Sequence, residues 1–246
     1  MDPEFSLDIT IDEQPESSVI AAFPGPGMAG ISANQYFIEQ LGLHETGYIH
    51  AEGLPAVTPF SEGRPYHHTR LFSKQGANYT FVTCELPIPA QLSEPFGRTL
   101  LDWIDESTVD EIALLTTLPS LESFEELFYV ASDDYYQHRL ADTEIGALQG
   151  GFLSGVNASL ISRAIDTTLR VGLIATFVNP RQPLDGGATL RLVEGLDQIY
   201  GFDIDTDQLR QFADRTRQHY EQLAAHVETQ QRAEKRMRRT DDIGFM

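Results

Sequence analysis

The stretch VIAAFPGPGMAGISANQYF, residues 19–37, constrains the fold most, because a strand, a tight turn and a helix are predicted there in direct succession. The apolar run Val19–Phe23 predicts a buried strand. The G-x-G-x-x-G pattern that follows lets the backbone turn and lets a helix approach that strand closely. The amphipathic pattern over Ile31–Leu41 predicts the helix. Strand and helix joined in this way are the repeating unit of a layered α/β protein.

The rest of the chain continues this alternation of apolar runs and amphipathic segments. Strands are predicted at residues 48–51, 69–73, 79–85, 111–116, 127–131 and 170–177, and helices at 95–106, from the turn at 150–155 to about 169, and at 187–200. Pro95 is expected near the first turn of its helix. This order predicts an α/β fold with a layered sheet.

A last long helix is predicted to start near residues 205–207. Its apolar stripe consists of Leu209, Phe212, Thr216, Tyr220, Leu223 and Val227. No apolar face follows, so we expect this helix to pack as far as Val227 and then to project from the body. The expected organisation is an acidic N-terminal segment (1–17), an α/β domain (18–206), a C-terminal helix or arm (207–239) and a free tail (240–246).

The charge balance excludes several partners. The chain carries 37 acidic and 17 basic residues, for a net charge of −20. Such a charge repels nucleic acid and anionic lipid. Only two of the basic residues are lysine, which favours an acidic surface adapted to high salt, in a salt-loving archaeon, over a surface for a basic partner. Residues 207–239 carry eight basic and five acidic residues, so the arm is locally basic.

The chain shows no features of a secreted or membrane protein. Its acidic start lacks the basic and apolar regions of a signal peptide, and no apolar run is long enough to span a membrane. Cys84 is the only cysteine, so neither an intrachain disulfide nor a cysteine metal cluster is possible. We therefore expect a cytoplasmic protein.

The glycine pattern at Gly25, Gly27 and Gly30 has two interpretations. It fits a nucleotide-binding turn between a strand and a helix. However, Pro26 has no N–H to offer a phosphate, and no acidic residue clearly ends a second strand. A tight turn without chemistry is the favoured interpretation.

The other candidate sites also have simple structural explanations. Ser154 in GGFLSGVNAS resembles a nucleophile elbow, but its order is G-x-x-S-G, as in a second glycine turn. His67 and His68 are adjacent and make a poor chelating pair. The pairs Asp133–Asp134 and Glu125–Glu126 fit a solvated acidic face. We therefore expect no catalytic residue, no cofactor and no metal site.

Three segments of this chain resemble the PAC2 family of proteasome assembly chaperone-like proteins. They are FPGPGMAGISANQYFIEQLGL, the central GGFLSGVNASLISRAIDTTLRVGLIAT, and the long last helix followed by the apolar end IGFM. The resemblance implies a three-layer sandwich similar to the nucleoside phosphorylase fold, without the catalytic residues of those enzymes. It also implies homo-oligomers that assemble or engage the 20S proteasome.

The resemblance also implies a binding role for the C-terminus. Some archaeal members end in a hydrophobic residue, a tyrosine and any residue, and this tail enters pockets between proteasome α-subunits. In this chain Gly244, Phe245 and Met246 occupy those positions, so the hydrophobic residue and the tyrosine hydroxyl are missing. The sequence thus predicts a non-enzymatic oligomer that binds α-subunits through its tail. The alternatives are a phosphorylase-like or ligase-like enzyme that binds nucleotide or phosphate at the glycine turns, and a structural oligomer without a proteasome link.

Overall fold

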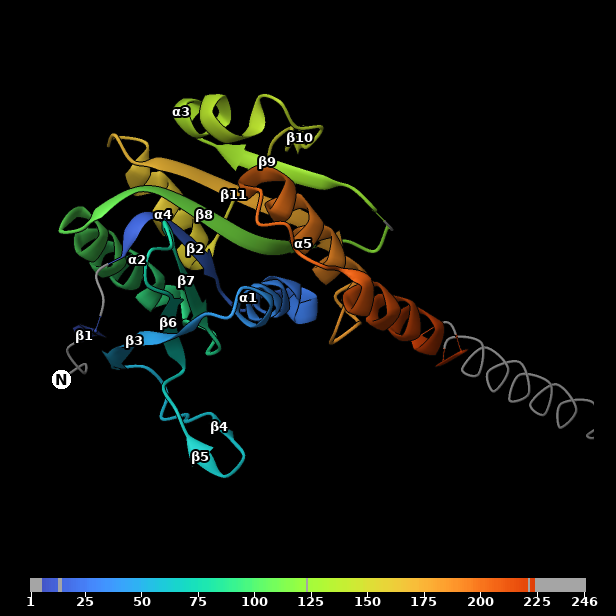
Figure 1. The fold of residues 1–246 in the computed structure, drawn as a ribbon, viewed down its shortest axis with the longest axis horizontal. Helices are drawn as coiled ribbons and strands as arrows, with labels where there is room; N and C mark the ends of the chain where they lie inside the picture. The colour runs from blue at the N-terminus through green and yellow to red at the C-terminus, as the bar shows by residue number, and fades with distance from the viewer. Residues whose placement is uncertain (1–5, 13–14, 123, 221, 224–246) are drawn as a thin grey trace, which may run out of the picture.

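The fold is built on one nine-stranded sheet (Figure 1). The computed structural model describes residues 6–12, 15–122, 124–220 and 222–223. The strands lie in the order β1-β3-β6-β7-β2-β8-β11-β9-β10. Their bounds are β1 (Ser6–Ile11), β2 (Glu16–Ala22), β3 (His44–Glu52), β6 (Thr69–Ser73), β7 (Tyr79–Cys84), β8 (Thr108–Pro119), β9 (Leu127–Ala131), β10 (Gly146–Ala147) and β11 (Arg170–Val178).

The middle of the sheet is parallel. Strand β2 pairs in parallel with β7 and β8, and β8 pairs in parallel with β11. A parallel sheet is covered on both faces, so its strands are continuously apolar. This explains the run from Val19 to Ala22, whose four side chains are all fully buried. Around this centre, β1, β3 and β6 pair antiparallel on one side and β9 pairs antiparallel with β11 on the other.

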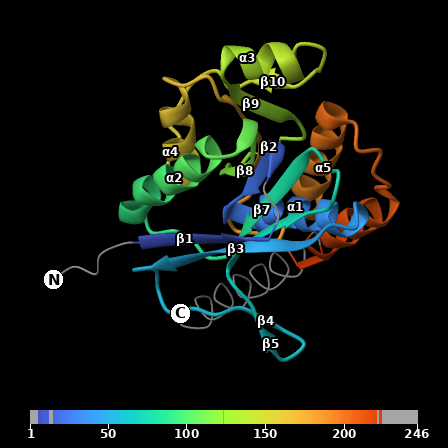
Figure 2. The same ribbon diagram turned by 60° about the vertical axis from the view of Figure 1, so that its left-hand side comes forward.

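Helices cover both faces of the sheet. The helical segments are η1 (Pro26–Met28), α1 (Ala29–Gln40), α2 (Ala90–Asp105), α3 (Asp133–Tyr135), η2 (Tyr136–Leu140), α4 (Gly155–Ala164) and α5 (Gly186–Tyr200). Figure 2 shows α2 and α4 on one side of the central strands and α1 and α5 on the other. The predicted α/β fold with a large central sheet is confirmed.

Alternating side chains of the central strands form two separate cores. Leu114 of β8 packs toward α2 and α4 with Phe96 and Leu160. Its neighbour Leu115 packs toward α1 and α5 with Phe37. Because successive side chains of a strand point to opposite faces, each central strand contributes to both cores and joins the two helical layers.

Two predicted helices have different bounds in the structure. Helix α2 begins at Ala90 rather than near Pro95, so the proline lies inside the helix. Proline removes one backbone hydrogen bond there, but the apolar face that this helix buries against the sheet holds it in place. Helix α4 ends at Ala164 rather than near residue 169, because the chain has to enter β11 at Arg170.

The predicted packing of the last helix as far as Val227 is wrong at Leu223. Residues 207–220 are helical, and Leu209 and Ala213 are buried. Leu223, however, is 47% exposed, so burial has ended one turn before Val227, which itself lies outside the described residues. The helix is held close at its start, where a side chain on Gly186 would come within 3.0 Å of the Cα of Ala213.

Three parts of the fold had no counterpart in the sequence prediction. Strand β1 pairs with β3 along its whole length, although residues 1–17 were expected to be a separate acidic segment. Asp133 and Asp134 lie in the first turn of the short helix α3, where acidic side chains interact favourably with the helix dipole. The loop after β3 contains a small hairpin, β4 (Phe60–Ser61) and β5 (Arg64–Pro65), which projects from the body (Figure 1).

Among the described helices, none is long and apolar enough to cross a bilayer.

Candidate functional site

The first glycine turn is filled by protein contacts. The Thr117 hydroxyl donates to the Pro26 carbonyl at 2.6 Å, and the Asp185 N–H donates to the Gly27 carbonyl at 3.1 Å. Gly27 has a φ of 67°, which a residue with a side chain rarely adopts. A side chain on Gly30 would lie 2.8 Å from the Leu115 carbonyl oxygen. These glycines therefore serve the close approach of α1 to β8, and the geometry favours a tight turn.

The second glycine turn leaves Ser154 without an activating partner. Ser154 precedes α4 in an extended conformation, and within the described part of the chain its hydroxyl has no hydrogen-bond partner. A serine nucleophile needs a base within hydrogen-bond reach. The neighbouring Phe152 side chain is fully exposed.

The two adjacent histidines have separate environments. The His67 ring stacks on Tyr48 at 3.7 Å between ring centroids. The His68 Nδ1 lies 2.8 Å from the Thr69 hydroxyl, and burial lowers the pKa of His68. Among the described residues, no group of three or more His, Cys, Asp or Glu side chains could hold a metal ion.

A buried ion cluster lies elsewhere, around Glu111 of β8. Its side chain is fully buried and accepts hydrogen bonds from Arg139 at 3.0 and 3.1 Å, Arg170 at 3.2 Å and Tyr200 at 2.8 Å. Burial raises the pKa of this carboxyl, but the hydrogen bonds from Arg139 and Tyr200 outweigh it and hold the pKa below its ordinary value. These donors come from η2, β11 and α5, so the cluster ties β8 to those three elements.

A groove lies at the carboxyl ends of β8 and β11, a common place for ligand sites in open α/β sheets. It has a volume of about 780 Å³ and lies between the last helix and the loop after β8. Its apolar wall consists of Leu121, Phe124, Phe177, Val178 and Leu190. The rings of Phe124 and Phe177 contact each other with centroids 4.6 Å apart. This groove was not predicted, because its residues are spread from position 121 to 220.

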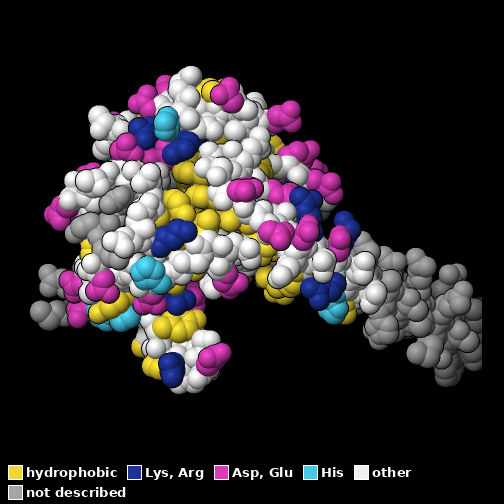
Figure 3. Space-filling view, viewed as in Figure 1, with side chains coloured by type: hydrophobic (Ala, Val, Ile, Leu, Met, Phe, Trp, Pro, Cys, Tyr) yellow, Lys and Arg dark blue, Asp and Glu magenta, His cyan; other side chains and the backbone are white. Residues whose placement is uncertain are grey.

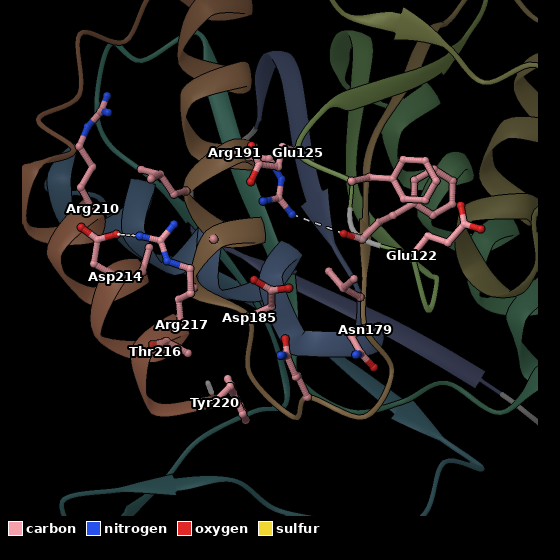
Figure 4. A pocket seen from close by; sticks show the side chains of 18 of the residues that line it. Glu122, Glu125, Asn179, Asp185, Arg191, Arg210, Asp214, Thr216, Arg217 and Tyr220 are labelled. Carbon is pink, nitrogen blue, oxygen red and sulfur yellow. Dashed lines mark hydrogen bonds and ion pairs between the residues drawn. The ribbon is translucent and has the colours of Figure 1, made fainter. Parts of the chain in front are cut away.

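Arg191 lies in the middle of the groove (Figure 4). Its Nε donates to the Thr176 hydroxyl at 3.0 Å and one terminal nitrogen donates to the Phe177 carbonyl at 3.4 Å. Figure 4 shows it between the last helix, which carries Arg217, and Glu122 on the opposite side. Its side chain is half-buried, and burial lowers its pKa although nearby carboxylates partly oppose this effect.

The nearby carboxylates of Asp185, Glu125 and Glu126 act on Arg191 only from beyond ion-pair distance. Arg217 pairs with Asp214 at 2.7 Å, and Arg210 pairs with Glu194. For Arg191 no carboxylate of the described residues forms an ion pair. The guanidinium therefore keeps N–H donors that can bind an anionic group entering the groove.

The tail residues assigned to partner binding, Gly244, Phe245 and Met246, lie outside the described residues. Their role stays a prediction.

The face shown in Figure 3 carries hydrophobic side chains in its middle and acidic side chains over much of its edge. The acidic edge fits the net charge of −20.

Comparisons with known proteins identify a matching family and similar folds. A family model described as the PAC2 family matches residues 19–224. An uncharacterized protein of Methanocaldococcus jannaschii is 22% identical over 207 residues, which is 84% of each chain. The structure resembles Pyrococcus furiosus PbaA, an archaeal homolog of proteasome-assembly chaperone, with a TM-score of 0.76 and 17% identity over 92% of this chain and 100% of that one.

A second similar structure is Pyrococcus furiosus PbaB, an archaeal proteasome activator. The TM-score is 0.76 and the identity is 15%, over 91% of this chain and 100% of PbaB. At this level of identity, the two structural matches show a shared fold.

Proposed function

This chain belongs to the PAC2 family, and from that premise we propose that it is a proteasome assembly chaperone-like protein without enzymatic activity. It forms homo-oligomers in the cytoplasm of a salt-loving archaeon and engages α-subunits of the 20S proteasome. The observation that carries the proposal is the fold, which this chain shares over nine-tenths of its length with PbaA and PbaB.

The geometry of the glycine turns supports a non-enzymatic role. The carbonyls of Pro26 and Gly27 are bonded to Thr117 and Asp185, and the glycines lie against β8. A phosphate cradle uses free backbone N–H groups around an open turn, whereas the Met28 N–H of this turn already donates to the Gly25 carbonyl at 3.1 Å. Among the residues that the structure describes, Ser154 has no hydrogen-bonded base, and no group of three or more His, Cys, Asp or Glu side chains includes His67 or His68.

The C-terminal tail is the proposed contact with the α-subunits. Phe245 and Met246 fill a pocket between subunits, and the terminal carboxylate of Met246 binds a lysine. Because Phe245 has no hydroxyl and Gly244 adds no apolar area, one tail binds weakly. Several tails on one oligomer then raise the overall affinity through effective concentration.

Two further features belong to the same proposal. The domain at 18–206 is similar to the nucleoside phosphorylase fold, and residues 207–239 form a C-terminal helix or arm. The basic residues of this arm are attracted to acidic surfaces. The arm can therefore contact an acidic surface of a ring subunit or of its own body.

Reconstitution with α-subunits of the source organism tests the function. The full chain is mixed with recombinant α-subunits in molar KCl, and the complexes are weighed by native mass spectrometry. We expect a complex that contains several copies of this chain together with α-subunits. A monomeric chain, or an oligomer that leaves α-subunits unbound, contradicts the proposal.

Thermal unfolding with ATP, NAD and nucleosides tests the enzyme alternative. A ligand at about 100 times its dissociation constant stabilises the folded state by about 2.7 kcal/mol, which is easily seen as a rise in melting temperature. We expect no rise with any of these compounds. A clear rise with one of them favours a nucleotide-binding enzyme instead.

A further inference from the structure

The groove at the carboxyl ends of β8 and β11 combines two recognition features. One is the aromatic wall of Phe124 and Phe177. The other is Arg191, a half-buried guanidinium that forms no direct ion pair with a carboxylate of the described residues, although Asp185, Glu125 and Glu126 lie near enough to act on it. Together they select a ligand that has one anionic group next to a large apolar group.

The charges at the rim limit what this ligand can be. Glu122, Glu125 and Asp185 also line the groove, and none of them has an ion-pair partner among the residues that the structure describes. Three carboxylates repel a polyanion such as a nucleotide. They tolerate a single carboxylate on Arg191, and they attract a ligand that also carries basic groups.

We propose that this groove binds the C-terminal tail of the same chain, with the Met246 carboxylate on Arg191 and the Phe245 ring against Phe124 and Phe177. The tail has the required chemistry. Its end, Ile-Gly-Phe-Met, joins a free carboxylate to three large apolar side chains, and a methionine sulfur packs well against aromatic rings.

The charge of the preceding segment supports this occupant. Residues 232–239, RAEKRMRR, carry five basic residues and one acidic residue. Asp241 and Asp242 lie between this basic run and the apolar end, but residues 232–242 together carry five basic and three acidic residues, so the segment that leads to the groove is net basic and is attracted to the rim carboxylates of Glu122 and Glu125. The rest of the body is acidic as well, which draws the run back toward it.

The length of the chain permits the contact. Tyr220 lines the groove, and the last described residue, Leu223, is followed by 23 residues. Such a segment spans up to about 75 Å when extended, far more than a return to the groove requires. A tether of this length gives an effective concentration near the millimolar range, so a weak contact is enough to hold the tail.

While this contact is formed, the tail is not available to another protein. This consequence rests on the proposed function: a tail bound in its own groove is withheld from the α-subunits until the ring pocket competes for it. The contact itself needs no proteasome, so it can be tested on this chain alone.

Photo-cross-linking of the full chain tests the proposal. A benzophenone amino acid replaces Phe245, the protein is irradiated, and the adducts are located by mass spectrometry. We expect adducts at residues 121–124 and 177–190 of the same chain. A mixture of isotope-labelled and unlabelled protein distinguishes this from contact between copies. Adducts elsewhere, no adducts, or adducts only between copies overturn the proposal.

Two controls identify the role of Arg191. Arg191→Gln lowers the adduct yield about tenfold, the loss expected for one charge-assisted contact. Arg215→Gln, an exposed position on the last helix that does not line the groove, leaves it unchanged. In the chain with native Arg191, the free peptide RRTDDIGFM suppresses the adducts, whereas the same peptide with a C-terminal amide does so about tenfold less effectively. Equal competition by both peptides rules out a carboxylate on Arg191.

Discussion

Replacing Arg139 by methionine tests the role of the buried ion cluster. Arg139→Met keeps an apolar stem of similar length and removes the guanidinium. The fully buried Glu111 then loses its hydrogen bonds of 3.0 and 3.1 Å from Arg139, and Tyr200 loses the cation 4.4 Å from its ring centroid. Glu111 keeps the hydrogen bonds from Arg170 at 3.2 Å and from Tyr200 at 2.8 Å.

The expected loss follows from these contacts. Removing one partner of a buried ion pair costs about 3–5 kcal/mol when the other charge is left alone. A hydrogen bond to a charged group contributes about 1.5–3 kcal/mol. Because Arg170 still compensates the Glu111 charge, we expect the free energy of unfolding at pH 7 to fall by about 2–3 kcal/mol.

The pH dependence gives a second readout. The pKa of Glu111 is lowered in the folded state, so the cluster stabilises the fold above the unfolded-state pKa of about 4.3. This stabilisation is lost as the pH falls through the folded-state pKa. The difference between the wild type and the Arg139→Met variant therefore shrinks as the pH is lowered below about 4.

Urea unfolding followed by circular dichroism measures both effects at fixed salt concentration. The matched control is Arg98→Met, which removes an exposed pair with Glu94 and is expected to lower the free energy of unfolding much less, because solvent screens that pair. A loss for Arg139→Met as small as the control's, or one that stays constant from pH 7 to about pH 3, refutes the reasoning.

Three further predictions concern single residues. Gly30→Ala places a Cβ 2.8 Å from the Leu115 carbonyl oxygen, so urea unfolding should show a loss of about 1–3 kcal/mol, whereas Gly150→Ala, with no atom within 4 Å, should change stability by less than about 0.5 kcal/mol. Burial raises the pKa of Cys84 to about 11, so a thiol reagent at pH 8 should label it only after unfolding; rapid labelling of the native protein contradicts the buried position. Phe245→Tyr restores the family's hydroxyl and should tighten binding to α-subunits about two- to tenfold in a titration; unchanged binding shows that this ring makes no such hydrogen bond.

The sequence predicted the centre of the fold because local signals there agree. The strand at β2, the turn and helix α1 are marked by a four-residue buried run, by glycines and by helical spacing. The edges carry weaker signals. Strand β1 reads SLDITI, whose acidic residue faces away from the core, and its pairing with β3 depends on residues some forty positions away. Contacts of that range leave no local pattern.

The sequence analysis also did not predict that a charged side chain is buried. Glu111 was placed at the start of a predicted strand, but nothing local shows that Arg139, Arg170 and Tyr200 converge on it. Its position directly before the apolar run Ile112–Leu115 was the available signal, because a carboxylate there enters the core with the strand. Arg191 lies likewise on the helix that follows β11, and its place in the groove depends on the last helix.

Binding of proteasome α-subunits with and without the last three residues tests the central claim most directly. The full chain is compared with a chain that ends at Ile243, and the dissociation constant is measured in molar KCl. If Gly244, Phe245 and Met246 dock in the ring, the truncated chain binds at least about tenfold more weakly. Equal dissociation constants for the two chains contradict the claim that the tail makes the contact.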